Sequence, residues 1–472
     1  MPSKTIKEIQ DSILKGNANC VEQVKHYLSS INKQKHLNAF VEVFEEEALH
    51  QAGLIDEKIK SGNAGKLAGV VVGIKDVLAY KNHKLTCGSK ILEGFNSLYT
   101  ATAVQRLIDE DAIIIGTLNC DEFAMGSSNE TSVYGPTLNA IDTERVPGGS
   151  SGGSAVAVQA DMCTVALGTD TGGSVRQPAA FCNVWGLKPT YSRISRYGLA
   201  SYASSFDCIG TFTNCPEDAA LLLEIMSGKD EKDSTSSSAP VNDYTLSEES
   251  DQKYKVAYLS EALHHEGLSP EVKEVFEEKI KNLKEAGHQV EEINFELLPY
   301  LLPTYYILTT AEASSNLSRY DGVRYGYRTE QDNNTELLYK KSRTEGFGPE
   351  VQKRIILGTF VLSADYFDAY YVKALKARKL IRNKTLEILN DYDFIMTPTA
   401  PTEPYKLGEH DKDQMAMYLG DVFTVQASLC GLPSLNIPFL NKKSGYPVGV
   451  QITGAPFKEQ EILQAGKFFK SL

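Results

Sequence analysis

Short apolar runs rich in β-branched residues alternate with helical patterns along most of the chain, and no other feature constrains the fold as strongly. Such runs are typical of buried strands, and helices between them are typical of α/β proteins. The sequence therefore predicts an α/β fold with a largely parallel or mixed sheet covered by helices. The expected strands are Val70–Ile74, Ile113–Ile115, Cys163–Leu167, Lys255–Leu259 and Phe394–Thr397, followed by SLNIPFL and VGVQITG near the C-terminus.

Two of the expected helices have boundaries that can be read from the residues. Thr5 and Glu8 have the spacing of a capping box and predict the start of an N-terminal helix. Ser269, followed by Pro270, predicts the start of another helix, which Gly287 ends. A further long helical stretch is expected to follow Pro349.

A polar segment, 229–250, with the sequence KDEKDSTSSSAPVNDYTLSEES, interrupts the pattern of strands and helices. Its composition predicts a surface loop or a linker rather than part of the core. It separates a half of the chain dense in glycine and serine from a C-terminal part.

Composition and charge exclude several classes of function. No apolar run approaches the roughly 18 residues that span a bilayer, and the N-terminus resembles no signal or transit peptide, so we expect a cytoplasmic protein with no membrane contact. The net charge of −13 argues against a chain that binds nucleic acid by itself, but it describes the bulk of the chain and leaves a local basic patch open. The eight cysteines are scattered and no paired Cys/His motif occurs, so reduced, mostly buried thiols and no metal are expected.

Two blocks rich in glycine and small hydroxyl residues are the main candidates for a functional site: GGSSGGS at 148–154 and GTDTGGS at 168–174. A phosphate cradle, a plain turn and a serine-based catalytic site are the alternatives. The phosphate cradle is disfavoured, because neither block is followed by the lysine of a P-loop or has the GxGxxG spacing. A plain turn would explain either block alone, whereas two blocks so close together favour a catalytic site.

The surroundings of the two blocks fit that third alternative. The first block runs into SAVAVQA, so its serines lie near the N-terminus of an expected helix, where backbone N–H groups are unpaired. The second block follows the expected strand Cys163–Leu167, and its small residues allow N–H groups to converge as an oxyanion hole requires. Ser174, at its end, is the candidate nucleophile.

A serine nucleophile needs a base, and no histidine lies between His83 and His264. A distant histidine could fold back to the serine, as in Ser-His-Asp enzymes, although the GxSxG motif is absent. A desolvated lysine is the alternative base. Lys75 ends the apolar run VVVGI, and its pKa would have to fall from about 10.4 to roughly 7–8. Taken alone, however, Lys75 also fits a strand-end lysine whose ammonium reaches water.

The segments GIKD, PGGSSGGSA and GTDTGGSVRQPAAFCNVWGLKPT resemble the amidase signature family of Ser-Ser-Lys amide hydrolases, from about residue 5 to the end of the chain. The resemblance implies a single α/β domain, 1–472, with a central mixed β-sheet covered by helices on both faces. The implied parts are N-terminal helices at 1–60, a catalytic core at 61–225, a polar surface loop at 229–250 and a C-terminal part, 251–472, that completes the sheet and the substrate pocket.

The resemblance also implies roles for individual residues. Ser174 would be the acyl-ester nucleophile, and Ser150, in a cis peptide in this family, would shuttle a proton between Ser174 and Lys75. Asp170 and Arg176 would support the loop. The implied oxyanion hole consists of the backbone N–H groups of Thr171, Gly172, Gly173 and Ser174.

Three other segments, DEFAMGSSNETSVYGPTLN, EASSNLSRYDGVRYGYR and SRTEGFG, resemble the glutaminase subtype of the family. In that subtype an arginine binds the α-carboxylate of glutamine and an aspartate binds its α-ammonium. The resemblance implies that Arg354 has the role of this arginine and Asp421 the role of this aspartate. Without the resemblance, a surface salt bridge and a helix cap are the default roles of these two residues. The other implied substrate contacts are Met125, Gly126, Ser127 and Tyr305, with Tyr306 as the alternative to Tyr305.

The function implied by the resemblance is that of a glutaminase within a tRNA-dependent amidotransferase. The chain would hold no cofactor, and would pass ammonia to its partners, the B and C subunits of a heterotrimer. That complex would use ATP and Mg²⁺ to amidate Glu-tRNA(Gln), with Asp-tRNA(Asn) left open as a second acceptor and the charged tRNA bound mainly by a partner. The alternatives are a stand-alone amidase acting on simple amides and a non-enzymatic nucleotide-binding module.

Overall fold

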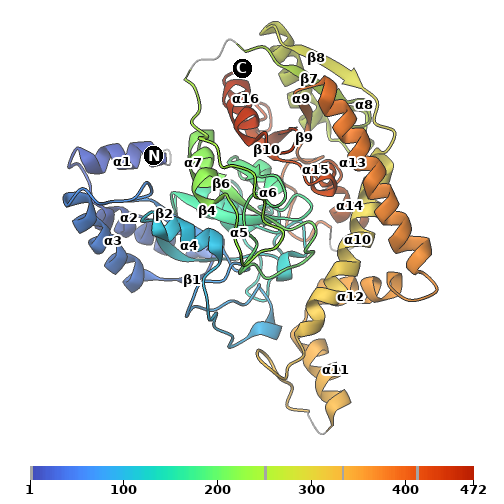
Figure 1. Ribbon diagram of the computed structural model, residues 1–472, viewed down its shortest axis with the longest axis horizontal. Coiled ribbons are helices and arrows are strands. Elements are labelled where there is room, and N and C mark those ends of the chain that lie inside the picture. Colours follow the sequence, from blue (N-terminus) through green and yellow to red (C-terminus); the bar gives the residue numbers. More distant parts are fainter. Residues whose placement is uncertain (1–3, 249–251, 332–333, 411–413) are drawn as a thin grey trace.

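The protein is described by a computed structural model that covers residues 4–248, 252–331, 334–410 and 414–472 (Figure 1). One sheet of eleven strands runs through the described residues in the order β1-β3-β2-β4-β6-β5-β10-β11-β9-β7-β8. The strands are β1 Phe40–Val43, β2 Val71–Lys75, β3 Ile113–Leu118, β4 Val165–Asp170, β5 Trp185–Lys188, β6 Cys208–Thr213, β7 Lys255–Leu259, β8 Gln289–Ile293, β9 Phe394–Pro398, β10 Ser434–Leu440 and β11 Pro447–Thr453.

The sheet is mixed, as the sequence predicts. Strand β2 pairs in parallel with β3 and β4, and β7 pairs in parallel with β8 and β9. The strands between these two groups pair antiparallel, and β10 and β11 form a hairpin in which Ser434 faces Thr453. Each of the seven expected strands is present: β7 and β10 have the expected ends, and the other five are shifted, for example β4, which extends beyond Leu167 to Asp170.

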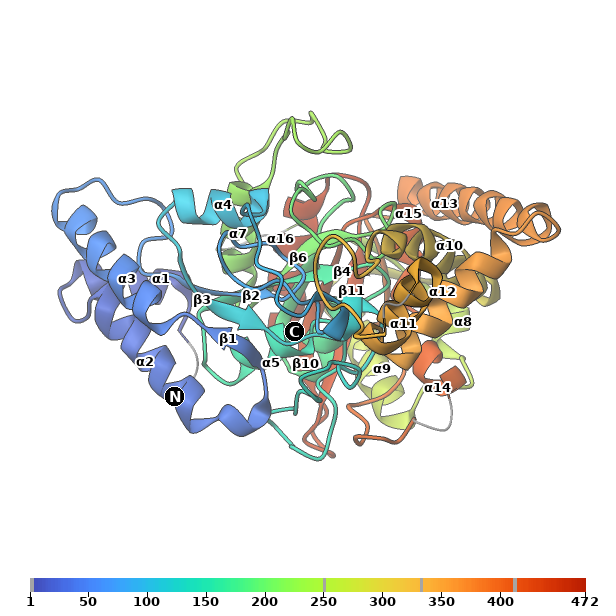
Figure 2. The ribbon, with the colours of Figure 1, turned by 90° about the horizontal axis from the view of Figure 1, so that it is seen from below.

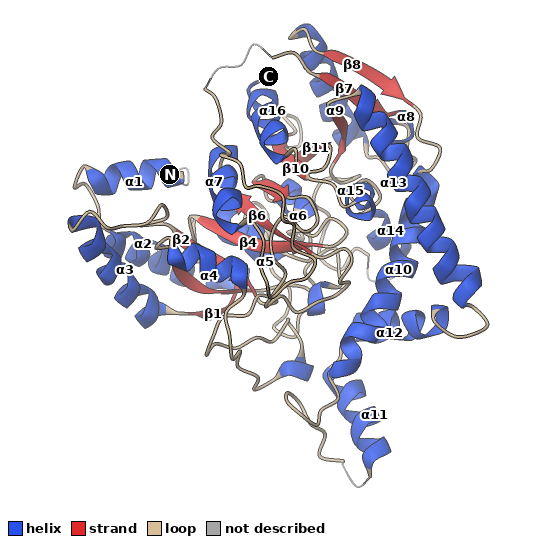
Figure 3. Cartoon of the chain, in the orientation of Figure 1, coloured by secondary structure: helices blue, strands red, loops and turns tan. Residues whose placement is uncertain are grey.

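Helices surround the sheet, as Figure 3 shows. The N-terminal helix has the capping box at Thr5 and Glu8, and α9 is capped by Ser269, as expected. The helices are α1 Ile6–Leu14, α2 Cys20–Lys33, α3 Glu45–Lys60, α4 Thr102–Asp109, α5 Gly152–Gln159, α6 Arg176–Phe181, α7 Pro216–Met226, α8 Ser260–Leu263, α9 Pro270–Glu285, α10 Leu301–Asn316, α11 Thr335–Gly346, α12 Pro349–Val361, α13 Lys373–Asp391, α14 Gln414–Leu419, α15 Val425–Cys430 and α16 Glu459–Ser471, with a π-helical segment, η6 Phe367–Val372, before α13.

Both faces of the sheet are buried by helices. Val71 and Ile113 belong to a hydrophobic cluster with side chains of α2, α3 and α5. Their neighbours Val72 and Ile114 belong to a second cluster, with side chains of α4 and α7. Because successive side chains of a strand point to opposite faces, the two clusters cover opposite sides of β2 and β3. This confirms the expected α/β fold.

The molecule is elongated. Figure 2 shows helices α1 to α3 at one end and helices α10 to α13 at the other, with the sheet between them. Helix α10 packs against α12 and α13, and the elbow between α12 and α13 extends well beyond the sheet (Figures 1 and 2).

The polar segment has no helix or strand in its described residues, 229–248, yet it is attached to the surface. Asp230 accepts hydrogen bonds of 2.6 Å from the hydroxyls of Thr102 and Ser195. The Tyr244 hydroxyl accepts a hydrogen bond from Arg193, and only 2% of Tyr244 is exposed. These contacts describe a surface loop rather than a free linker; residues 249 and 250 lie outside the described part.

Three expectations from composition can be compared with the described part of the chain. All eight cysteines lie within it as free thiols, and seven of them are buried. None of its helices is long and apolar enough to cross a membrane. Nor does it contain a group of three or more His, Cys, Asp or Glu side chains arranged to hold a metal ion.

Candidate active site

Lys75 ends strand β2, and its side chain is completely buried. Its ammonium donates hydrogen bonds to the hydroxyls of Ser150, Ser151 and Thr169, at 2.7, 2.9 and 3.0 Å. This excludes the alternative in which the ammonium reaches water. Burial lowers the pKa of Lys75 to about 8, since no carboxylate pairs with it directly. A lysine in this state can exchange a proton near neutral pH.

The contacts of Lys75 with Ser151 and Thr169 are absent from the sequence-based prediction. Ser151 is the second serine of GGSSGG, and its hydroxyl also donates to the Thr169 carbonyl at 3.2 Å. Thr169 lies on β4, beside the strand that carries Lys75. The doubled serine was the only available sign of Ser151, and nothing in the sequence pattern distinguished Thr169.

The first glycine- and serine-rich block, 148–154, packs closely against neighbouring segments. The peptide bond between Gly149 and Ser150 is cis, and helix α5 begins at Gly152. A side chain at Gly149 would collide with the carboxylate of Asp121, so only glycine fits there. This close approach places Ser150 against Lys75.

The second block lies at the end of β4, and only 8% of Ser174 is exposed. Strands β2 and β4 are parallel neighbours, with Ile74 opposite Leu167, so Lys75 and the block emerge at the same edge of the sheet. The N–H of Ser151 donates to the Ser174 carbonyl at 3.3 Å, which joins the two blocks directly.

The loop that precedes Ser174 presents unpaired donors. Among the described residues, none of the backbone N–H groups of residues 171–174 donates to another protein group. Gly173 has a φ of 145°, and a side chain there would collide with Thr424. A side chain at Gly172 would collide with the ring of Tyr305. The loop therefore requires glycine and offers N–H groups to a developing negative charge.

Buried contacts fix this loop. Asp170 and Arg176 are fully buried and joined by two charge-assisted hydrogen bonds of 2.9 and 3.0 Å. Burial alone would raise the pKa of Asp170, but the Arg176 charge outweighs it and holds that pKa below its usual value. Thr171 donates to Asp207 at 2.7 Å, and Thr424 donates to the Gly172 carbonyl at 2.5 Å. These partners act on the loop rather than on a substrate.

Arg354 lies on helix α12 and is only 4% exposed, so it is not part of a surface salt bridge. Its Nε donates to Glu350 at 2.8 Å and its Nη1 donates to the Tyr202 hydroxyl at 3.0 Å. The guanidinium also lies 5.5 Å from the ring centre of Tyr306 and 6.0 Å from that of Tyr418. Aromatic rings thus surround a buried cation.

Asp421 is buried after helix α14, and its carboxylate accepts from the hydroxyls of Ser127 and Tyr306 at 3.1 and 3.2 Å. Both partners are side chains of distant segments rather than helix amides, so this carboxylate does not serve as a helix cap. Burial raises the pKa of Asp421 to about 7. A ligand cation would therefore favour its charged form.

Tyr305 and Tyr306 are adjacent on α10 and reach different parts of the site. Tyr305 lies against Gly172 of the oxyanion loop, and Tyr306 lies between Asp421 and Arg354. Both tyrosines are therefore candidate substrate contacts, Tyr305 on the side of the oxyanion loop and Tyr306 on the side of the two charged residues. Of the segment 125–127, Ser127 reaches Asp421, whereas Met125 is fully buried and Gly126 packs on Asp121.

Sequence reasoning missed several residues around these charges: Tyr202, Glu350, Tyr418 and Thr424. Glu350 precedes Arg354 by one helical turn, and this spacing was the available signal. Tyr418 and Thr424 flank Asp421 in MYLGDVFT. Tyr202 had no local signal.

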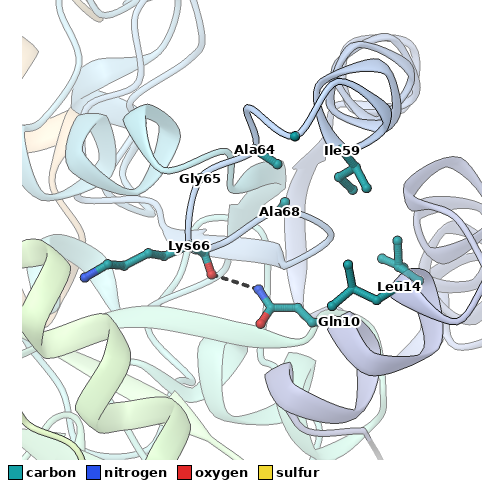
Figure 4. A pocket seen from close by; sticks show the side chains of 9 residues that line it. Gln10, Leu14, Ile59, Ala64, Gly65, Lys66 and Ala68 are labelled. Carbon is teal, nitrogen blue, oxygen red and sulfur yellow. Dashed lines mark hydrogen bonds between the residues drawn. The ribbon is translucent and has the colours of Figure 1, made fainter.

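A cavity of about 590 Å³ lies beside this group. It is lined in part by Ser128, which follows Ser127, and by Glu350, which holds Arg354. A separate groove of about 320 Å³ lies near the N-terminus, between α1 and α3 (Figure 4). There Gln10 donates to the Lys66 carbonyl, and no serine or cysteine is among the described residues that line the groove. Of these two cavities, the first adjoins the candidate chemistry.

A buried lysine on two serines, beside a loop of free N–H groups, is an arrangement suited to serine-based hydrolysis of amides. The amidase family model matches residues 22–463, and the chain belongs to that family. This confirms the resemblance and the fold class, and it argues against a nucleotide-binding module.

Several relatives within the family are similar to this chain over nearly its whole length. The chain is 46% identical to the A subunit of glutamyl-tRNA(Gln) amidotransferase from Chlorobium phaeobacteroides, over 98% of each chain, and 49% identical to its counterpart from Acidobacterium capsulatum, over 92% of each. The crystal structure of the corresponding protein from Thermotoga maritima is 38% identical, with a TM-score of 0.78, covering 98% of this chain and 93% of that one. A structure described as an amidase has a TM-score of 0.84 at 27% identity, covering 99% of each chain.

Proposed function

We propose that this chain is the glutaminase subunit of a tRNA-dependent amidotransferase. The observation that carries the proposal is a pair of buried, oppositely charged side chains, Arg354 and Asp421, which both contact Tyr306. Thr424 links Asp421 to the loop that precedes Ser174. Free glutamine has a carboxylate and an ammonium on one carbon, so its recognition needs one cation and one anion close together. The identity of the relatives, higher to amidotransferase subunits than to the amidase structure, supports the same conclusion.

In the proposed reaction, Ser174 attacks the side-chain amide carbon of glutamine. Its proton passes through Ser150 to the neutral amine of Lys75, and the negative oxygen is stabilised by the N–H groups of residues 171–174. The proton then returns to the leaving nitrogen, which departs as ammonia and leaves a glutamyl ester on Ser174. Water attacks this ester with the same proton relay, and glutamate is released.

The substrate would be oriented by the charged side chains. Arg354 presents a planar guanidinium to the α-carboxylate, and Asp421 accepts hydrogen bonds from the α-ammonium. Tyr305, next to Gly172, would contact the part of the substrate nearest the reacting carbon, and Tyr306 the α-ammonium side.

Ammonia would pass to partner B and C subunits in a cytoplasmic heterotrimer. There ATP and Mg²⁺ would activate Glu-tRNA(Gln), with Asp-tRNA(Asn) as a second candidate, before amidation. This chain would bind no cofactor and leave the charged tRNA mainly to its partners, in agreement with its net charge of −13.

Substitution of Arg354 tests the proposal. Arg354→Ala should lose about 2–5 kcal/mol of transition-state stabilisation for glutamine, the range for one partner of a buried charge pair. It should lose far less for an amide that lacks the α-carboxylate. The measurement is kcat/KM for both substrates, and equal losses would mean that Arg354 is structural. A wild-type chain that prefers the apolar amide would identify a stand-alone amidase.

A further inference from the structure

A band of large apolar side chains is exposed along α12, η6 and α13, on the elbow that extends beyond the sheet (Figures 1 and 2). Each is between 38% and 69% exposed. We call this band the elbow face; it consists of Ile356, Leu357, Phe360, Tyr366, Phe367, Tyr370, Leu375 and Leu380. An exposed cluster of this kind marks an interaction site in a soluble protein.

The aromatic part of the elbow face is continuous. The ring centres of Phe360 and Tyr366 lie 4.2 Å apart, and the ring of Tyr370 lies 5.9 Å from Tyr366 and 6.0 Å from Phe360. The opposite sides of the two helices face the protein, since Gly358 of α12 packs directly on α10 and Ile381 of α13 is buried. The fold therefore uses the inner sides of these helices and leaves the elbow face uncovered.

Positive charge accompanies the apolar band on α13. This helix carries six basic residues and two acidic ones, in a chain with a net charge of −13. Within the described residues, Lys373, Lys376 and Lys379 are exposed and have no ion pair. Asp365 and Asp368 lie in the elbow itself, so the positive charge is concentrated along α13.

The lysines of α13 indicate which kind of molecule the elbow face can bind. Symmetric pairing of two copies through this face would bring the three lysines of each copy against those of the other, which is repulsive. Nucleic acid needs a dense row of cations along its phosphates, whereas here three exposed lysines accompany eight exposed apolar side chains. A protein surface with an apolar centre and acidic edges complements the elbow face in both respects.

We propose that the elbow face docks an amphipathic helix of a partner subunit, with Asp and Glu along the edges of its apolar side. The proposal rests on the proposed function for the existence of that partner. Leu375 and Lys379 are four residues apart on α13, and so are Lys376 and Leu380; a separation of about one helical turn suits packing against another helix. Exposed tyrosine and phenylalanine side chains are also typical of the centre of such interfaces.

The test is the affinity of the full chain for the co-expressed partner B and C subunits. The double variant Leu380→Glu/Lys376→Glu should raise the dissociation constant at least tenfold. A matched control, Leu14→Glu/Lys15→Glu, changes an exposed leucine and a lysine of α1 and its cap at the other end of the molecule (Figure 2), and should bind like the wild type. Unchanged thermal unfolding midpoints would show that both variants are folded.

The results separate the two proposals. If the wild-type chain binds the partner subunits and the elbow variant binds them with the same affinity, the docking surface is overturned and the proposed function is not. A wild-type chain that does not bind the partner subunits overturns both proposals. A wild-type homodimer that only the elbow variant disrupts assigns the face to a second copy and overturns the partner helix.

Discussion

At the scale of single residues, the environment of Lys75 decides its chemistry. An exposed lysine remains protonated at neutral pH. The Lys75 side chain is instead fully buried, and its hydrogen-bond partners are hydroxyl groups, which carry no charge that would stabilise the ammonium. Burial lowers its pKa to about 8, which leaves a useful fraction of neutral amine near neutral pH. The same burial raises the pKa of Asp421 to about 7, so the two groups respond to burial in opposite directions.

The pH dependence of Ser174 labelling by a fluorophosphonate tests Lys75 without involving Arg354 or Asp421. The protonated form of Lys75 is inactive as a base, so the labelling rate should rise about tenfold per pH unit below pH 8 and level off above it. Lys75→Arg should not be labelled, because a guanidinium does not release its proton in a protein. A rate that is flat from about pH 6 to pH 9, or an active arginine variant, would contradict the proton relay.

At the scale of elements, the turn between α14 and α15 joins the substrate side of the site to the nucleophile loop. The turn spans residues 420–424; Asp421 is its second residue and Thr424 its last. The Thr424 hydroxyl donates to the Gly172 carbonyl at 2.5 Å and to the Asp421 carbonyl at 3.0 Å, and the Thr424 carbonyl accepts from Arg176. One residue therefore holds both the oxyanion loop and the residue proposed to bind the α-ammonium.

Thr424→Val keeps the shape of the side chain and removes the hydroxyl. The Gly172 carbonyl is then left unpaired, at a cost of about 1–3 kcal/mol in the free energy of unfolding. We expect kcat for glutamine to fall about 10–100-fold with a smaller change in KM, because the Asp421 carbonyl keeps its hydrogen bonds from the N–H groups of Thr424 and Val425, whereas the Gly172 carbonyl loses its partner. Thr213→Val is the control, since it removes a buried hydroxyl that donates to the Cys215 carbonyl. Equal kinetic losses in the two variants would make Thr424 merely structural.

At the scale of the whole molecule, the site is assembled from distant parts of the sheet and its helices. Strands β2 and β4 supply the lysine and the nucleophile loop, while α10, α12 and the turn after α14 supply the residues proposed to bind substrate. A relative shift of α12, which bears both Arg354 and part of the elbow face, would change the pocket. We therefore expect a partner bound at the elbow face to affect hydrolysis through this helix.

We expect the isolated chain to be a weak glutaminase. A coupling of about 1–3 kcal/mol between partner binding and hydrolysis corresponds to about 5–150-fold. Addition of the partner subunits with ATP and Glu-tRNA(Gln) should raise glutamate release at least several-fold. In the complex, Ser174→Ala should lose glutamine-dependent amidation and retain the reaction with free ammonium. Full turnover by the chain alone, unchanged by partners, would contradict the coupling.

The sequence by itself determined the features that depend on local pattern. The apolar runs placed β2, β3 and β4, and the caps at Thr5 and Ser269 placed the starts of two helices, because strand and helix signals arise within a few residues. It also marked Lys75, Ser150 and Ser174, whose flanking motifs are long and specific. Their proposed roles stay predictions.

Only the tertiary structure decided the features that depend on distant partners. Strand β8, QVEEI, carries two glutamates and has no strand pattern; it forms because β7 offers an edge to pair with. Tyr202 meets Arg354 across 152 positions and Thr424 meets Gly172 across 252, so no local spacing could reveal either contact. The long-range packing of the chain also decided the burial that lowers the pKa of Lys75 and leaves the elbow face exposed.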